Sequence, residues 1–305
     1  MQYHVTKEEQ EYLDRYDIRQ FEQPSVTADI AVFAIREREE SREYRKDPDL
    51  VLSLLLIQRG NYPYKDCWAL PGGFLRPGES TEENACRELA EETSITKAYL
   101  RPFGIFSEAG RDPRGWILSH GFLALVDHRD YQVRAGADAW DARWFNLSVD
   151  VRDQQKQIEG ARALLTCRYR LTLENPELGI ALTAELEEIR RFDQHHEAIS
   201  YRILRDDGFA FDHAKIILQA FLELQRQTAR EGTIVFDLMP ERFTLNMLQD
   251  VTEIILGRRL LTPNFRRKMQ PLVTATDEIV TGIGHRPAKL YKRNLEAYYA
   301  LPENQ

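Results

Sequence analysis

The sequence predicts an α/β sandwich, with strands on both sides of one helix, followed by a small α+β domain. Three observations support this prediction. Strand-like runs lie on either side of an acidic helical segment, the C-terminal region carries two helix patterns before two short strands, and the balance of charge changes along the chain. A length of 305 residues is sufficient for two domains with a sizeable core.

The N-terminal part begins with a short amphipathic lead-in over residues 1–25. Its apolar positions include Tyr12, Leu13 and Tyr16. Apolar runs at 26–35 and 50–59 then predict two strands. The highly charged segment 36–49 between them is expected to be a solvated hairpin connection.

The segment GFLRPGESTEENACRELAEETSI, residues 73–95, resembles the Nudix signature G-x5-E-x7-R-E-U-x-E-E-x-G-U, where U is aliphatic. It matches at eight of nine specified positions, namely Gly73, Glu79, Arg87, Glu88, Leu89, Glu91, Glu92 and Ile95. Ser94 stands where the signature has glycine. A chance match this good is on the order of one in a million. The resemblance implies a Nudix sandwich with a catalytic helix and a pocket for a nucleoside diphosphate linked to another group.

The acidic residues of this segment also indicate a metal site by their spacing. Glu88, Glu91 and Glu92 fall at i, i+3 and i+4, so their carboxylates project from one helix face. These charges repel each other unless a hard cation such as Mg²⁺ or Mn²⁺ binds their oxygens. We expect all three to be catalytic metal ligands, with Arg87 fixing Glu91 and, as in Nudix relatives, the Gly73 carbonyl assisting. The alternative is a solvated acidic helix.

Local signals predict the ends of this helix. Ser80 or Thr81 can cap its first turn, where Glu82 and Glu83 favour the helix dipole. The side chains expected in the core are Ala85, Leu89 and Ala90. If position 94 requires a positive φ as the C-cap, serine there costs about 1 kcal/mol and removes no ligand.

After the helix, the runs 99–108 and 116–126 predict strands. The loop between them contains Arg111 and Arg114, which are suited to binding phosphate bidentately. We expect both to bind substrate. The alternative is a pair of structural salt bridges in which Asp112 is a candidate partner.

A short strand is predicted at 142–147. From about 150 to 208 the pattern changes to alternating runs with a turn at Asn175-Pro176, which predicts an inserted β element. A role at a dimer interface is one candidate for it.

A long helix then follows Asp212, a good N-cap residue. Its apolar positions are Ile216, Leu218, Phe221, Leu222 and Leu224. His213, in the first turn, is expected to be packed or capping, with a catalytic role as the alternative.

The C-terminal region has the layout of a winged helix. Thr244 is expected to cap a helix that ends at Gly257, and Thr262-Pro263 to start a second one. Pro271 would end that second helix early. Two short strands, VTATDEIV and AKLYK, then surround a Gly-rich turn, as a wing requires.

The second helix is expected to read DNA. Burial of Phe265, Met269 and Leu272 leaves an outward face of Asn264, Arg266, Arg267, Lys268 and Gln270. Arg286 and Lys289 lie on the wing, where they can contact phosphates. The alternative is a small helical domain with a solvated basic face.

Composition limits the classes of function. The net charge of -8 alone would not suggest nucleic acid, but residues 256–294 contain nine Lys/Arg against two acidic residues. The three cysteines have no CxxC spacing, which favours a reducing, cytoplasmic compartment and argues against a zinc site. Neither a signal peptide nor a membrane span is expected.

Taken along nearly its whole length, the chain resembles NrtR-type Nudix-related transcriptional regulators. The resemblance rests on the signature segment and on residues 106–126, 139–147 and 211–218, together with RRLLTPNFRRKMQPL and GHRPAKLYK near the end. It implies an ADP-ribose-pyrophosphatase-like Nudix domain, a C-terminal winged helix-turn-helix, a homodimer, ADP-ribose or a related nucleotide as effector, and repression of NAD-metabolism genes. Many such domains have lost catalysis, but the complete set of carboxylates here favours retained Mg²⁺-dependent hydrolysis.

We therefore expect a Nudix domain at 1–208, and a linking helix with the winged helix-turn-helix at 209–305. Two functions are compatible with this organisation. The first is a metabolite-responsive repressor that binds an operator in double-stranded DNA. The second is a plain ADP-ribose pyrophosphatase whose C-terminal domain only dimerises.

Overall fold

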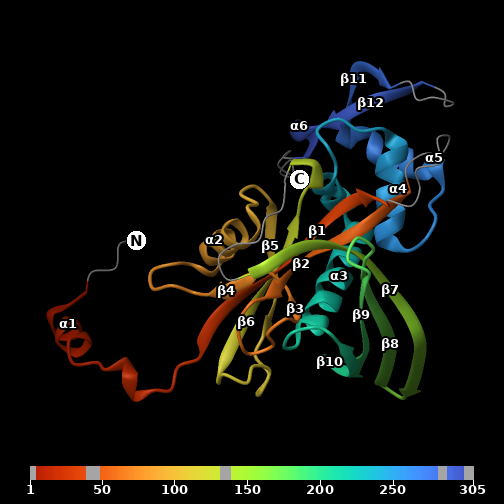
Figure 1. The fold of residues 1–305 in the computed structure, drawn as a ribbon. Helices are drawn as coiled ribbons and strands as arrows, with labels where there is room; N and C mark the ends of the chain where they lie inside the picture. Colours follow the sequence, from red (N-terminus) through yellow and green to blue (C-terminus); the bar gives the residue numbers. More distant parts are fainter. Residues whose placement is uncertain (1–4, 39–48, 131–138, 281–286, 299–305) are drawn as a thin grey trace.

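The computed structural model describes residues 5–38, 49–130, 139–280 and 287–298. A mixed 10-stranded sheet dominates it, with the strand order β10-β9-β8-β7-β2-β1-β6-β5 (Figure 1). The main strands are β1 Ser25–Glu37, β2 Leu50–Arg59, β5 Tyr99–Phe106, β6 Ile117–Leu125, β7 Ala139–Glu159, β8 Arg162–Asn175, β9 Ile180–Asp193 and β10 His196–Asp207. The short strands β3 Trp68–Ala69 and β4 Gly72–Phe74 pair with β2 and β1.

The predicted hairpin is confirmed, because β1 pairs antiparallel with β2. Most of its connecting loop, residues 39–48, lies outside the described residues. On its other side β1 pairs parallel with β6, which makes the sheet mixed. Both β1 and β2 are buried along most of their length, as expected for apolar runs at the centre of a sheet.

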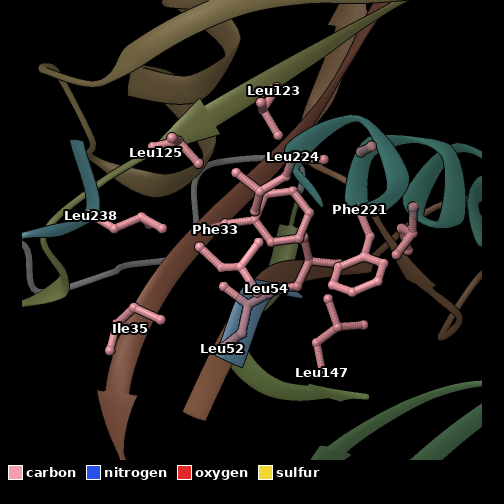
Figure 2. Close-up of a cluster of buried hydrophobic side chains, with 14 of the residues drawn as sticks. Phe33, Ile35, Leu52, Leu54, Leu123, Leu125, Leu147, Phe221, Leu224 and Leu238 are labelled. Atoms are coloured by element: carbon pink, nitrogen blue, oxygen red, sulfur yellow. The ribbon is translucent and has the colours of Figure 1, made fainter. Parts of the chain in front are cut away.

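Alternate side chains of β1 enter two different cores. Ile30 and Val32 pack on the face covered by α2 (Thr81–Thr93). Phe33, the residue after Val32, points to the opposite face and lies near Phe221 and Leu224 of α3 (His213–Arg230), as Figure 2 shows. The central strand therefore separates the signature helix from the long helix that follows the sheet.

The strand predicted at 142–147 is much longer than expected. β7 runs from Ala139 to Glu159, and β8, β9 and β10 extend the same sheet beyond it. Residues 148–159 are mostly exposed, and the run 152–157 contains no apolar residue, so the alternation by which a strand is recognised is interrupted there. The β element predicted at about 150–208 is thus continuous with the sheet through β7.

The N-terminal end of α2 is capped by Ser80, one of the two predicted candidates. Its hydroxyl accepts from the Glu83 backbone N–H, and the Glu83 carboxylate accepts from the Ser80 N–H. Ala85 and Leu89 are buried as predicted, whereas Ala90 is only partly buried. At the other end Ser94 is the C-cap with φ 64°, the left-handed conformation that the signature's glycine adopts without strain.

We expect Ser94→Gly to raise the free energy of unfolding by about 1 kcal/mol, because glycine removes the steric penalty of the left-handed C-cap. Urea denaturation would measure the difference. Ser94→Ala retains a Cβ and should give no such gain. Equal stability of the glycine variant and the wild type would contradict this expectation.

The C-terminal region forms the predicted winged helix. Its elements are η4 Thr233–Leu238, α4 Leu245–Leu256, α5 Thr262–Met269, η5 Gln270–Leu272, β11 Val273–Val280, β12 Ala288–Arg293 and α6 Leu295–Tyr298. Thr244 caps α4 by accepting from the Met247 N–H, and Gly257 ends it with a positive φ. β11 and β12 pair antiparallel as the wing. Its tip, residues 281–286, lies outside the described residues.

Two predicted caps differ from the structure. The N-cap of α5 is Leu261, and the Thr262 hydroxyl instead accepts from the Gln249 side chain at 3.2 Å. Asp212 occupies the N-cap position of α3 but makes no side-chain cap bond. Its carboxylate instead accepts hydrogen bonds from Arg111. The prediction for Pro271 is confirmed, since α5 ends at Met269 and a 3₁₀ turn follows.

The N-terminal lead-in contains α1 (Lys7–Leu13) and η1 (Ile18–Gln20), which extend away from the sheet in Figure 1. Its apolar side chains, including Tyr12 and Tyr16, are exposed. Among the helices of the described ranges, none combines the length and apolar character needed to cross a membrane.

The two parts of the chain share one hydrophobic core. Phe33 and Leu54 of the sheet belong to the same buried cluster as Leu248 of α4 and Phe265 of α5. α3 lies between them and contacts both the sheet and α4. The winged helix is therefore fixed to the sheet by packing as well as by the chain.

Candidate functional site

A pocket of about 330 Å³ lies where the sheet, α2 and the start of α3 meet. This volume is within the range of small-molecule sites. Its lining comes from six segments of the chain: Thr27 and Asp29; Ile57, Arg59, Gly60, Asn61 and Tyr62; Leu70, Gly72, Gly73 and Phe74; Glu88 and Glu92; Arg111, Asp112 and Arg114; and Phe211 and His213. The pocket therefore combines carboxylates with guanidinium groups, as a site for a metal and a phosphate requires.

Two of the three predicted metal ligands line this pocket. Glu92 accepts a hydrogen bond from the Gly72 N–H at 2.7 Å. Glu88 lies against Gly73, where a Cβ atom would be only 2.5 Å from its Oε1. Glycine at position 73 is thus what leaves room for the Glu88 carboxylate.

Glu91 differs from that prediction. Its side chain is half exposed, is not among the lining residues, and accepts from Arg76 and Arg87. The helical spacing places Glu91 beside Glu88 and Glu92, but its ion pairs with the two arginines direct its carboxylate away from the pocket. The Gly73 carbonyl accepts from the Asn84 side chain at 3.2 Å.

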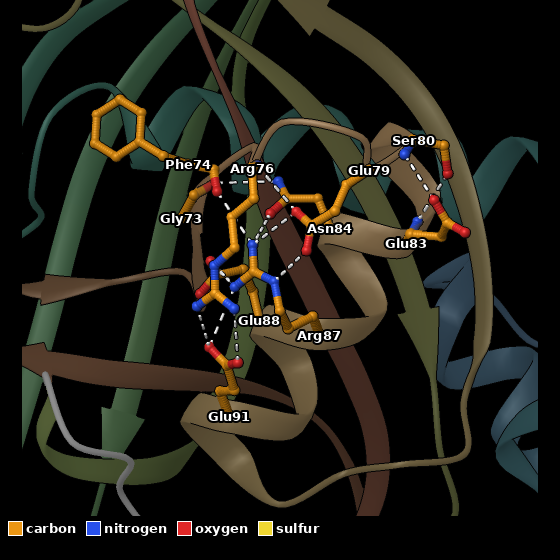
Figure 3. A network of polar contacts seen from close by, with 10 residues as sticks. All are labelled: Gly73, Phe74, Arg76, Glu79, Ser80, Glu83, Asn84, Arg87, Glu88 and Glu91. Carbon is orange, nitrogen blue, oxygen red and sulfur yellow. Dashed lines mark hydrogen bonds and ion pairs between the residues drawn. The ribbon is translucent and has the colours of Figure 1, made fainter.

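Arg87 connects the loop before α2 to the helix (Figure 3). Its guanidinium donates to Glu79, Glu88 and Glu91 and to the Phe74 carbonyl. The hydrogen bonds from the Arg87 side chain and the Arg76 backbone lower the pKa of Glu79 to about 2. The predicted contact with Glu91 is confirmed at 3.1 Å. In this geometry Arg87 positions the pocket's backbone and acidic residues.

The carboxylates fit a hard cation by their chemistry more than by their present arrangement. Over the described residues, no three His, Cys, Asp or Glu side chains converge closely enough to hold a metal ion. Glu88 and Glu92 nevertheless supply oxygen ligands beside the Gly72–Gly73 backbone, the donors that Mg²⁺ prefers. Glu91 would join them only after a rotamer change that releases Arg76 and Arg87.

Arg111 lines the pocket, but its charge is already paired. Its guanidinium donates to both oxygens of Asp212, at 2.7 and 3.2 Å, and lies 3.5 Å from Asp29. All three side chains are almost completely buried. The structural salt bridge considered as an alternative for Arg111 is therefore present, and it joins the sheet to the start of α3.

We expect Arg111→Ala to lower the free energy of unfolding by about 3–5 kcal/mol, because it removes the cation that lies between two buried carboxylates. Asp29 then loses its arginine, and, among the described residues, Asp212 keeps only Lys215, 3.2 Å away. Urea denaturation would measure this loss. Arg143→Ala is the control, since it removes a partly exposed pair with Asp141 and should cost only about 0–1 kcal/mol. Similar losses in the two variants would show that the buried pair is not a structural anchor.

Arg114 is better placed to contact a ligand. It is 38% exposed and pairs bidentately with Asp112, the partner that the sequence suggested. Its guanidinium carbon also lies 5.0 Å from the centre of the Phe74 ring and 5.2 Å from that of Phe211. These contacts hold a partly accessible cation at the pocket.

Several pocket residues were not predicted from the sequence. Arg59 ends the apolar strand β2, and burial, followed by the nearby charge of Arg114, lowers its pKa. Phe211 precedes the N-cap position of α3. Arg59 carries no motif, and Phe211 begins the segment 211–218 that supports the family resemblance but implied no role for this residue. His213 is fully buried and accepts the Leu70 N–H at 2.8 Å, which confirms the expected packed role.

The predicted DNA-reading face is exposed on α5. Phe265 and Met269 are buried, while Asn264, Arg266, Arg267 and Lys268 are exposed, as the spacing predicted. Arg266 donates to Asn246 and Arg267 to Asn264. Of the two wing residues, Lys289 is exposed on β12. Arg286 lies outside the described residues.

Comparison with protein families gives two matches. Residues 28–167 match the NUDIX domain, and residues 235–292 match the NrtR DNA-binding winged helix domain. Among curated proteins, the chain is 31% identical over 294 residues to the ADPR responsive transcriptional repressor NtrR of Acinetobacter baylyi. That alignment covers 95% of this chain and 90% of the relative.

Solved structures show the same combination of folds. A MutT/nudix family protein from Enterococcus faecalis superposes with a TM-score of 0.63 and 26% identity, over 96% of this chain and 100% of that one. Shewanella oneidensis NrtR complexed with a 27mer DNA gives a TM-score of 0.59 and 25% identity, over 89% and 94% of the two chains. The predicted fold, a Nudix domain followed by a winged helix, is confirmed.

Proposed function

Because this chain belongs to the NrtR family of Nudix-related transcriptional regulators, we propose that it is a transcriptional repressor whose Nudix domain binds ADP-ribose and whose winged helix binds an operator in double-stranded DNA. The observation that carries the proposal is the presence of both sites in one chain. The charged pocket and the exposed basic face of α5 are joined by α3 and a shared core. Genes of NAD metabolism are the expected targets.

The Nudix domain is further proposed to retain hydrolysis of ADP-ribose. Bound Mg²⁺ or Mn²⁺ would supply the charge that polarises a diphosphate. Glu88 and Glu92, assisted by the Gly73 carbonyl and by Glu91 after its rotamer change, would hold that metal. Arg87 holds the loop before α2 against the helix through its hydrogen bond to the Phe74 carbonyl. Arg114 binds the phosphate of the ligand, a role that its partial exposure beside the pocket supports.

We propose residues 1–208 as the sensing part and 209–305 as the DNA-binding part, with α3 as the linking element. Two copies forming a homodimer would present two α5 helices to the half-sites of a pseudo-palindromic operator. In each winged helix, the α5 side chains proposed to face the DNA groove are Asn264, Arg266, Arg267 and Lys268. The wing residues proposed to contact phosphates are Arg286 and Lys289. The three free cysteines agree with a reducing, cytoplasmic environment.

The alternative function is that of an ADP-ribose pyrophosphatase whose winged helix only mediates dimerisation. The match to a Nudix domain and the retained carboxylates favour some hydrolase capability, but they do not distinguish this alternative from a repressor that also hydrolyses. DNA binding distinguishes them, because only the repressor needs a basic helix that faces solvent.

The test is DNA binding by the full chain, measured by fluorescence anisotropy with duplex DNA from upstream of its own gene. We expect the logarithm of the association constant to fall linearly with the logarithm of salt concentration. Saturating ADP-ribose should weaken operator binding by about 5- to 150-fold. Failure to prefer this DNA over an unrelated duplex at any salt concentration would contradict the repressor function and favour the hydrolase.

A further inference from the structure

Phe211 belongs to the pocket and to the linking helix at the same time. Its side chain lines the pocket, and the residue directly precedes Asp212, the N-cap position of α3. Its backbone has φ 51°, which is uncommon for an aromatic residue. Residues held in such conformations cluster at ligand sites and switch regions, where surrounding contacts keep them in place.

Two of the side chains that contact Phe211 are arginines that line the pocket. The guanidinium carbons of Arg59 and Arg114 lie 4.8 and 5.2 Å from its ring centre. The Tyr64 ring is 4.7 Å away, and Tyr64 itself has φ 59°. Two cations suited to a phosphate thus rest on the same ring, so an anion that binds them competes with their contacts to Phe211.

The helix that starts beside Phe211 ends at the DNA-binding part. Leu224 of α3 is buried in the core shared with α4, and the Gln225 side chain donates to the Ile255 carbonyl of α4 at 3.1 Å. After α3, Gly232 lies beside Lys268 of α5. α3 is a single 18-residue helix, so a shift at its first turn reaches the contacts with α4 and α5.

We propose that Phe211 is the positioning residue that couples occupancy of the pocket by a diphosphate anion to the orientation of the winged helix. This inference rests on the proposed function. When the anion binds Arg59 and Arg114, the ring loses two of the contacts that hold its left-handed backbone, while those with Tyr64 and His213 remain. Phe211 then relaxes, and the N-terminal end of α3 moves with it.

The test compares ring-deleting and ring-preserving variants of the full chain. Phe211→Asn tolerates a positive φ but lacks the ring, Phe211→Leu keeps apolar volume without an aromatic face, and Phe211→Tyr keeps the ring. Trp140→Leu is the matched control, because it removes a ring that the Lys65 cation contacts outside the pocket lining and away from the start of α3. Thermal unfolding establishes which variants fold.

The measured quantity is the ratio of the operator dissociation constants with and without saturating ADP-ribose, and calorimetry gives the ADP-ribose concentration that saturates each variant. We expect the ratio to fall to about one in both ring-deleting variants. Phe211→Asn, which tolerates the positive φ, should keep the ligand-free operator affinity within about threefold of wild type. Phe211→Leu, which relaxes without ligand, should already bind the operator as weakly as the ADP-ribose-bound wild type. Phe211→Tyr and Trp140→Leu should retain the wild-type ratio.

Two results overturn the inference alone: a wild-type ratio in either ring-deleting variant, or an equal loss of the ratio in Trp140→Leu. A wild-type protein whose operator binding does not respond to ADP-ribose overturns the proposed function and this inference together. The two failures are therefore distinguishable.

Discussion

Replacing Arg266 and Arg267 together with alanine is expected to abolish specific DNA binding at physiological salt. Both side chains lie on the exposed face of α5, opposite the buried Phe265 and Met269. Loss of a base contact costs about 1–3 kcal/mol and relaxes specificity at that position. Loss of a phosphate contact weakens binding to all sequences alike and reduces the salt slope by about one.

Anisotropy titrations at several salt concentrations, with operator and unrelated duplexes, separate these two contributions. The control is Arg152→Ala with Arg162→Ala, which removes two exposed charges from the hairpin of β7 and β8. Because it deletes the same charge from a different surface, it should leave operator affinity within about threefold of wild type. Normal operator binding by the α5 variant would show that this helix is not the reader.

Any ADP-ribose hydrolysis should survive in the α5 variant, since the pocket contains no residue of that helix. Hydrolysis measured on the same preparation therefore also establishes that the variant is folded. Loss of both activities would indicate unfolding rather than loss of a DNA contact.

Glu92→Gln is expected to lower ADP-ribose hydrolysis by orders of magnitude with the fold intact. The substitution removes a negative charge beside the Gly72–Gly73 backbone, where the proposed metal would bind. A glutamine carbonyl can still accept the Gly72 N–H that Glu92 accepts at 2.7 Å. Stability should thus change little, which urea denaturation would check.

Glu82→Gln is the matched control, because Glu82 lies on the same helix but in its exposed first turn. Hydrolysis should be assayed with Mg²⁺ and separately with Mn²⁺. An equal loss of activity in the two variants would contradict the assignment of Glu92. No detectable hydrolysis by the wild type with either metal would eliminate the enzymatic function and leave ADP-ribose sensing.

Features that depend on neighbours in sequence could be predicted. The capping of α2 by Ser80 and of α4 by Thr244, and the end of α4 at Gly257, each follow from a few adjacent residues. The outward face of α5 follows from helical periodicity. The length of β7 was missed because most of its second half is exposed and shows no apolar alternation.

Features that depend on distant residues could not be predicted. Arg111 is separated by 101 positions from Asp212, and nothing in the local sequence shows that this carboxylate occupies its guanidinium. Glu91 has the spacing of a ligand, yet Arg76 and Arg87 direct it elsewhere. The position of Phe211 in the pocket also could not be predicted, because it depends on the path that the folded chain takes from β10 into α3.

The core shared by the sheet and the winged helix determines how the protein unfolds. Because Phe33 and Leu54 pack in the same cluster as Leu248 and Phe265, neither half can melt without exposing apolar surface of the other. Calorimetry should therefore record one cooperative transition. In a cell, a substitution that loosens the sensing half would also lower the amount of DNA-binding protein, so that its phenotype would be derepression even where no contact with DNA is altered.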